Sequence, residues 1–305
     1  MAGPPRGRVS DPSVPVLEHA DVRGLSPEHW RARLLASVDA PVQHGRRYPG
    51  FPDESTQRSF VGSAFGDALD EAWRFYTHLQ PRLDRGGWRG RPGRYLDFGC
   101  GWGRIGRFFL REFERGDMAG VDVDPSMIAF CREAAAPGGW FAIDNRQRLP
   151  FQDGAFKLVT AYSVFTHLPP DLFGPWMSEL LRVTAAGGLI AFTTEPPRFL
   201  DFVAGIDTSA PESGWHAALA AQLGDGAARR AELARTGCSF LPTGGGAHRA
   251  PDVYGDMVVT PDYISRAAEA GGGRLVEHLD DPGLFWQAVN VVRRGGGPAR
   301  SPFGA

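Results

Sequence analysis

The stretch YLDFGCGWGRIG, residues 95–106, runs from a short apolar segment through three closely spaced glycines into the start of a helix. The apolar letters predict a buried strand. Gly99, Gly101 and Gly103 allow the backbone to turn sharply and to approach a ligand closely, near the positive end of the helix that follows. The sequence therefore predicts a strand, a glycine loop and a helix that together hold a cofactor.

The glycine loop by itself fits two cofactors. Gly101 to Gly106 also satisfies the GxGxxG pattern of dinucleotide binding, so an NAD-dependent oxidoreductase is one interpretation. Asp97, inside the strand end, suits a cationic amino group better than a pyrophosphate. The expected strands 274–278 and 284–292 are joined by the turn Asp281-Pro-Gly, which makes them antiparallel, unlike the strands of a parallel NAD-binding sheet.

Outward from the glycine loop, strand and helix signals alternate. This rhythm predicts an α/β fold with a doubly wound, Rossmann-like parallel sheet and helices on both faces. Strands are expected at residues 95–98, 119–123, 140–143, 156–162 and 189–193.

Pro/Gly-rich stretches and breaks in the rhythm divide the chain. Helices are expected after the N-cap Ser26, along the apolar stripe Phe65–Leu83, over Gly214–Arg235 and over Pro261–Ala270. The division is a disordered tail (1–25), an N-terminal helical cap (26–92) able to fold over the cofactor, a cofactor-binding core (93–194), a substrate-side insert (195–258), a completion of the core sheet (259–295) and a tail (296–305).

Composition narrows the possible partners. The net charge of −2 provides no field for nucleic acid or an anionic membrane, and no apolar run approaches the length of a membrane span. Three cysteines without a CxxC or Cys/His cluster argue against a disulfide framework and against a metal site. The first residues lack the apolar core of a signal peptide. We therefore expect a cytoplasmic protein that acts on a small molecule.

Polar residues follow three further expected strands, where a doubly wound sheet places its ligand crevice. Asp122, about 20 residues after the glycine loop, is placed to accept hydrogen bonds from ribose hydroxyls, whereas Asp124 fits a helix N-cap better. Asp144 and Asn145 are able to reach an adenine edge, although a plain Asx turn is the alternative. Ser163 leaves the fourth strand.

These stretches together resemble a known family. LDFGCGWGRIGRF (96–108), GVDVDPSMI (120–128), LPFQDGAFKLVTAYSVFTHL (149–168) and ELLRVTAAGGLIAFTT (179–194) are similar to the successive motifs of class I S-adenosylmethionine (SAM) dependent methyltransferases of the small-molecule type. The resemblance covers residues 93–195 and, more weakly, 259–293. It implies a seven-stranded sheet whose seventh strand is antiparallel.

The resemblance also implies SAM as the cofactor. Asp97 and the glycines match the loop that holds the methionine part, Asp122 the ribose-binding acid, and Asp144 with Asn145 the adenine position. Strand three ends in Ile-Asp-Asn, where many relatives place an apolar residue after the acid. The implied cofactor-binding residues are Asp97, Gly99, Cys100, Gly101, Gly103, Asp122, Val123, Asp144, Asn145, Tyr162 and Ser163.

SAM carries an activated methyl group, so the protein supplies position and electrostatics. For a hydroxyl acceptor, which the resemblance favours as part of a natural product or sugar derivative, His167 is the expected general base, although this position often only supports the loop. Substrate contacts are expected from Glu195 at the end of strand five and from His216, His248 and Tyr254 in the insert. Trp176 and Trp286 are predicted as core aromatics. A SAM-fold scaffold, or a SAM binder with non-methyl chemistry, is the third interpretation.

Overall fold

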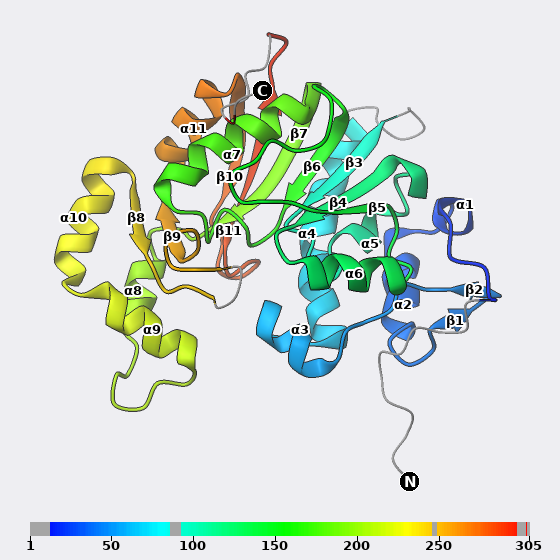
Figure 1. Ribbon diagram of the computed structural model, residues 1–305, viewed down its shortest axis with the longest axis horizontal. Helices are drawn as coiled ribbons and strands as arrows, with labels where there is room; N and C mark the ends of the chain where they lie inside the picture. Colours follow the sequence, from blue (N-terminus) through cyan, green and yellow to red (C-terminus); the bar gives the residue numbers. More distant parts are fainter. Residues whose placement is uncertain (1–12, 86–92, 246–248, 298–302, 304–305) are drawn as a thin grey trace. The chain divides into compact units, whose positions relative to one another are not determined.

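The computed structural model describes residues 13–85, 93–245, 249–297 and 303. The chain divides into two compact units, Met1–Ile143 and Asp144–Ala305. Strands from both units belong to one seven-stranded sheet of order β10-β11-β7-β6-β3-β4-β5 (Figure 1). The predicted α/β sheet with an antiparallel last strand is confirmed.

The first unit contributes β3 (Arg94–Phe98), β4 (Met118–Asp122) and β5 (Gly139–Ala142), which pair in parallel. Between them lie α5 (Gly106–Phe109), the 3-10 turn η1 (Arg115–Asp117) and α6 (Pro125–Glu133). Before the sheet come α1 (His19–Val22), α2 (Pro27–Ala36), the short pair β1 (Val42–Gln43) and β2 (Arg46–Arg47), α3 (Glu54–Val61) and α4 (Phe65–Arg85).

The second unit contributes β6 (Phe156–Ala161) and β7 (Thr184–Thr194), which are parallel, and β10 (Gly273–Leu279) and β11 (Ala288–Arg294). β11 runs antiparallel to both β7 and β10. Helix α7 (Pro170–Val183) packs on β7, and α11 (Pro261–Ala270) packs on β10 and α7. Numbered along the chain, the strand order is 3-2-1-4-5-7-6, which differs from the all-parallel 3-2-1-4-5-6 order of NAD-binding domains.

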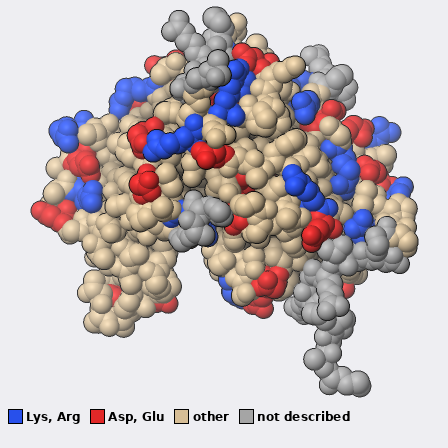
Figure 2. Space-filling view, in the orientation of Figure 1, with Lys and Arg blue, Asp and Glu red and all other residues tan. Residues whose placement is uncertain are grey.

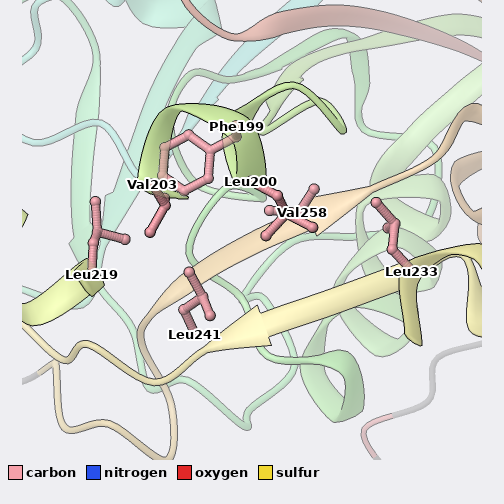
Figure 3. Close-up of a cluster of buried hydrophobic side chains, with 7 residues drawn as sticks. All are labelled: Phe199, Leu200, Val203, Leu219, Leu233, Leu241 and Val258. Atoms are coloured by element: carbon pink, nitrogen blue, oxygen red, sulfur yellow. The ribbon is translucent and has the colours of Figure 1, made fainter. Parts of the chain in front are cut away.

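The insert has an apolar core of its own. It contains α8 (Phe199–Ala204), α9 (Gly214–Leu223), α10 (Gly226–Thr236) and the antiparallel pair β8 (Cys238–Leu241) and β9 (Asp256–Val259). Buried side chains from all five elements meet there (Figure 3): Phe199, Leu200, Val203, Leu219, Leu233, Leu241 and Val258.

Three expectations differ from the structure. The single helix expected over 214–235 is two helices, because Gly224 ends α9 in a non-helical conformation and Asp225 caps α10 through the N–H groups of Ala227 and Ala228. The tail expected over residues 1–25 includes α1, with Leu17 and Val22 buried; its residues 1–12 lie outside the described part. The C-terminal tail includes Phe303, whose ring lies 4.9 Å from that of Trp176.

Candidate functional site

The glycine loop of the first unit is bent and tied down by its backbone. Gly99, Gly101 and Gly103 have φ values of 71°, 49° and 75°, which residues other than glycine rarely adopt. The N–H groups of Gly99 and Cys100 donate to the Val121 carbonyl at 2.8 and 3.0 Å. Burial raises the pKa of the Cys100 thiol, with a further rise from the neighbouring Cys131. Cys100 therefore serves the loop through its backbone.

Asp97 holds the far end of this loop. Its carboxylate is buried, and Oδ2 accepts the Gly106 N–H at 3.0 Å, at the first residue of α5. The expected helix is only four residues long, because turns occupy the residues before it. A helix this short adds little dipole, so the loop offers a ligand backbone groups and the Asp97 carboxylate rather than a strong helix end.

Asp122 ends β4 and organises the loop from the other side. Its Oδ2 accepts the Gly101 N–H at 2.7 Å, and its Oδ1 accepts the Asp124 N–H at 2.9 Å. A carboxylate presents two acceptor oxygens side by side, which suits two adjacent hydroxyls. Asp124 caps α6 through the Ser126 N–H at 2.9 Å, as expected, and the half-buried Val123 lies between the two acids.

The N-terminal segment packs against the glycine loop within the first unit. The buried Arg107 guanidinium packs against the rings of Phe51 and Trp102, at 4.4 and 4.7 Å from their centroids. Burial lowers the pKa of Arg107 to about 9. A Cβ built on Gly101 would lie 3.9 Å from Phe60 of α3, so the aromatic residues before the sheet cover this loop.

In the second unit, the segment after β5 is held as a fixed loop. Asp144 is exposed, and its Oδ1 accepts the Arg146 N–H at 2.9 Å, which is the Asx turn weighed above. The Asn145 carbonyl accepts the Trp176 indole N–H at 3.0 Å. Within the described residues, Oδ2 of Asp144 and the Asn145 side chain make no hydrogen bond that would compete with a ligand for these groups.

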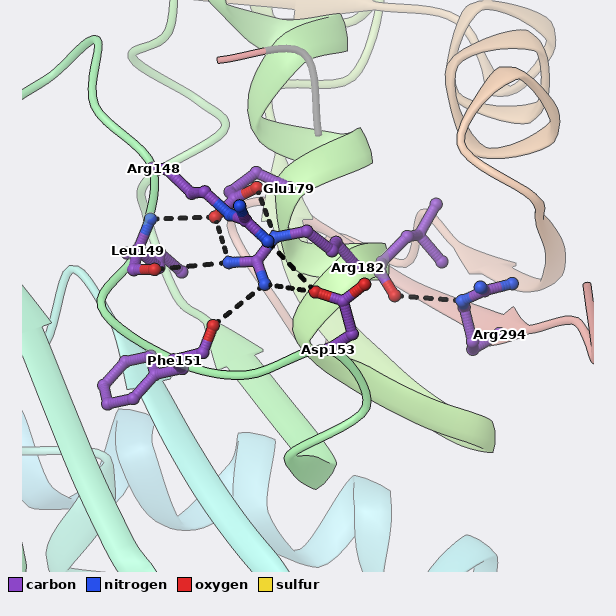
Figure 4. A network of polar contacts seen from close by, with 8 residues as sticks. Arg148, Leu149, Phe151, Asp153, Glu179, Arg182 and Arg294 are labelled. Carbon is purple, nitrogen blue, oxygen red and sulfur yellow. Dashed lines mark hydrogen bonds and ion pairs between the residues drawn. The ribbon is translucent and has the colours of Figure 1, made fainter. Parts of the chain in front are cut away.

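The continuation of this loop rests on a buried ion pair (Figure 4). Glu179 and Arg182 of α7 pair at 2.6 Å, and the Leu149 N–H donates to Glu179 at 2.8 Å. The Arg182 guanidinium donates to the carbonyls of Leu149 and Phe151 and to the Asp153 carboxylate. Removing either partner of a buried pair leaves an uncompensated charge, so the loop position depends on both.

A closed ring of hydrogen bonds lies where β6 and β7 end. Ser163 follows the buried Tyr162 and has a φ of 57°, a strained value for a residue with a side chain. Its N–H donates to Thr193 Oγ1 at 2.7 Å, and Thr193 donates to Gln287 Oε1 at 2.6 Å. Gln287 Nε2 returns to Ser163 Oγ at 2.9 Å. The ring fixes Ser163 in its strained conformation.

Glu195 extends this ring. Its side chain accepts from Gln287 Nε2 through Oε1 at 3.3 Å, whereas Oε2 is buried without a hydrogen-bond partner among the described residues. The residue is 3% exposed. Burial, followed by the nearby Asp256 carboxylate, raises the pKa of Glu195 to about 8. Near neutral pH the carboxyl is therefore protonated and has an O–H to donate.

His167 is oriented by the backbone of the insert. Its Nδ1 lies 2.7 Å from the Gly255 carbonyl and 3.9 Å from Asp256 Oδ1, and its ring stacks on Tyr254 at 4.3 Å. Burial lowers the pKa of His167 although Asp256 and Gly255 act in the opposite direction. A neutral imidazole that donates from Nδ1 to Gly255 keeps its lone pair on Nε2, the state that a general base requires.

Three residues around Ser163, Glu195 and His167 were not predicted from the sequence. Asp256 accepts from Thr243 Oγ1 at 2.6 Å and from the Trp215 indole at 3.3 Å, and it faces His167. Thr193 and Gln287 complete the ring around Ser163. Gln287 bonds a residue 124 positions away, so no local pattern marks it.

The other expected substrate contacts are distributed over the second unit. His216 lies on α9, where its Nδ1 is 2.8 Å from Ser213 Oγ at the helix N-cap. Tyr254 stacks on His167, whereas His248 lies outside the described residues. In the described ranges, no group of three His, Cys, Asp or Glu side chains is arranged to hold a metal ion. None of the helices in these ranges has the length and apolar character needed to span a membrane.

Comparison with known proteins gives a family match over part of the chain. Residues 96–188 match the family model described as a methyltransferase domain. A fatty-acid O-methyltransferase of Mycolicibacterium smegmatis is 33% identical over 107 residues, which cover 35% of this chain and 38% of that protein. A 2-methyl-6-phytyl-1,4-hydroquinone methyltransferase of Synechocystis is 30% identical over 97 residues, covering 31% and 30%. The chain thus matches well under half the length of these relatives.

Solved structures show similarity at lower identity. A 1,6-didemethyltoxoflavin-N1-methyltransferase of Burkholderia thailandensis, solved with bound 1,6-didemethyltoxoflavin and S-adenosylhomocysteine, is 13% identical with a TM-score of 0.48. The match covers 89% of this chain and 91% of that one. The family resemblance of residues 96–188 is confirmed by the family model.

Proposed function

We propose that this chain, whose residues 96–188 match a methyltransferase domain, is a class I SAM-dependent methyltransferase that transfers a methyl group from SAM to a small-molecule acceptor. The observation that carries the proposal is the match of this segment to a methyltransferase domain, with the glycine loop and Asp122 arranged within it as described. The acceptor atom that we propose is a hydroxyl oxygen, because a neutral, oriented imidazole suits removal of a hydroxyl proton.

The residues of the first unit fit the cofactor. SAM supplies an electrophilic methyl group on a sulfonium whose departure leaves a neutral thioether. The glycine loop presents backbone without side chains, Asp97 supplies a carboxylate for the amino group, and Asp122 supplies two oxygens for the ribose hydroxyls. The roles of Asp144 and Asn145 at adenine, and of Tyr162 and Ser163 on the methionine side, are proposals from the family resemblance.

The residues of the second unit suit the acceptor. With SAM bound as the methyl donor, His167 Nε2 would accept the proton of the acceptor hydroxyl. The Gly255 carbonyl fixes the tautomer through Nδ1. Glu195, protonated and with Oε2 unpartnered, donates a hydrogen bond to the acceptor. A buried donor without a hydrogen-bond partner is destabilising by on the order of 1–3 kcal/mol. A hydrogen bond from Glu195 to the acceptor would offset this free energy.

The first test is SAM binding by calorimetry. Asp122→Asn removes one charge and one acceptor oxygen, and we expect SAM to bind at least about tenfold more weakly, because hydrogen bonds to charged groups contribute on the order of 1.5–3 kcal/mol. Asp124→Ser, which keeps the α6 cap, is the matched control and should bind as the wild type does. Absence of SAM binding by the wild-type chain would refute the proposed function.

The second test concerns the general base. In His167→Asn the side-chain amide preserves donation to the Gly255 carbonyl but has no basic nitrogen. We expect turnover to fall by about 10²–10⁴ with SAM affinity unchanged, measured with methyl-labelled SAM and hydroxylated acceptors found by screening. Tyr254→Phe keeps the ring beneath the imidazole and serves as the control. An unchanged rate would remove His167 from the base role.

A further inference from the structure

An exposed group of aromatic rings lies in the second unit. Trp215 and Trp286 are 39% and 44% exposed, which is unusual for side chains of this size, and Phe202 lies between them. The Phe202 ring is 4.9 Å from Trp286 in an edge-to-face arrangement and 6.1 Å from Trp215. The prediction of Trp286 as a core residue is wrong. We call Phe202, Trp215, His216 and Trp286 the aromatic rim.

The aromatic rim borders the polar residues assigned to the acceptor. The Trp215 indole N–H points to Asp256, which lies 3.9 Å from His167. At the other end, Trp286 directly precedes Gln287, which bonds both Ser163 and Glu195. Asp256 thus links Trp215 to His167, the proposed base. Gln287, the residue after Trp286, contacts Glu195, the proposed donor.

The surroundings favour an uncharged ligand. Glu195 and Asp256 are buried, and among the described residues no arginine forms an ion pair with either. Arg198 is engaged by Asp280 and by the Trp286 carbonyl. Helix α9, which carries Trp215, contains no Asp, Glu, Lys or Arg, and Figure 2 shows mostly uncharged side chains over it. A ligand carboxylate here would lie near the Asp256 carboxyl, which would oppose its binding.

We propose that the aromatic rim is the acceptor-binding surface and that its ligand is a planar aromatic molecule carrying a neutral hydroxyl group. This proposal rests on the proposed function, since His167 is the base that the hydroxyl must reach. Tryptophan and phenylalanine rings at mixed angles offer both faces and edges to a flat ring. The matched methyltransferase domain ends at residue 188, before the rim begins, so this match does not determine which acceptor the rim binds.

The test is binding of matched probes to the full chain by calorimetry without SAM. 2-Naphthol carries the expected ring and hydroxyl, 2-naphthoate replaces the hydroxyl by a carboxylate, and decanoate represents a fatty acid. We expect 2-naphthol to bind at least about tenfold more tightly than either anion. No binding of 2-naphthol, or tighter binding of an anion, overturns the proposal.

Variants then locate the binding surface. Trp286→Ala should weaken 2-naphthol binding at least about fivefold and Trp286→Phe should restore most of it, whereas Phe141→Ala, at an exposed aromatic of β5, should have no effect. Thermal unfolding confirms that each variant is folded. Unchanged binding in a folded Trp286→Ala protein, or an equal loss in Phe141→Ala, refutes the rim. If the protein does not bind SAM but binds 2-naphthol in a manner that depends on Trp286, the proposed function is refuted and the proposed binding surface is retained.

Discussion

Glu195 and His167 are two single residues whose pKa values move in opposite directions for the same physical reason. Burial disfavours the charged form, so it raises the pKa of the carboxyl and lowers that of the imidazole. A neutral base and a neutral donor therefore coexist near pH 7. The rate should fall on the acid side as His167 gains a proton below pH 6.5, and on the alkaline side as Glu195 loses one near pH 8.

Glu195→Gln tests the alkaline side. A glutamine donates through its amide and has no proton to lose in this range, so kcat should stay level above pH 8 where that of the wild type declines. The acid limb, set by His167, should be unchanged. The measurement is a pH–rate profile of both proteins at saturating SAM. A decline of equal size in the variant would show that another group titrates there.

The same substitution has a stability consequence whose sign is fixed. The folded pKa of Glu195 is about 8 and the reference value is 4.5, so the folded state binds the extra proton and its stability falls as the pH rises through that window. The loss is on the order of a few kcal/mol. Urea unfolding at pH 5 and pH 9 should therefore show a smaller pH-dependent loss for Glu195→Gln than for the wild type.

Strand β4 shows how one element depends on its neighbour. Gly120 pairs with Trp140 of β5, and a Cβ built on Gly120 would lie 2.2 Å from the indole ring. We expect Gly120→Ala to destabilise the protein by about 3 kcal/mol or more, because the ring cannot move without displacing its packed surroundings. Gly116→Ala, where a Cβ meets nothing within 4 Å, should change stability by less than about 1 kcal/mol. Urea midpoints of the two variants check this.

Helices whose first residues carry a capping side chain and a proline could be predicted from the sequence. Features that depend on contacts between residues far apart in the chain could not. Ser26-Pro27 and Thr260-Pro261 place a cap and a proline at the starts of α2 and α11, and both helices begin there. Helix α5 is shorter than its apolar pattern suggested. Asp122 could be proposed from the sequence because a strand end and a spacing mark it. Gln287 could not, because it reaches Thr193 and Ser163 through contacts between residues far apart in the chain.

At the scale of the whole molecule, the insert has a buried cluster separate from the sheet, so its stability can be altered selectively. Leu219 of α9 is fully buried in that cluster. Leu219→Ala should cost about 2–5 kcal/mol, and hydrogen exchange should accelerate in α8, α9 and β8 while β3 and β4 stay protected. Because the proposed cofactor residues of the first unit lie outside the insert, SAM affinity should persist as acceptor turnover falls. Leu223→Ala, at the partly buried edge of the cluster, is the milder control. Uniformly faster exchange, reaching β3 and β4 to the same extent, would instead mean that the insert and the sheet unfold as one cooperative unit.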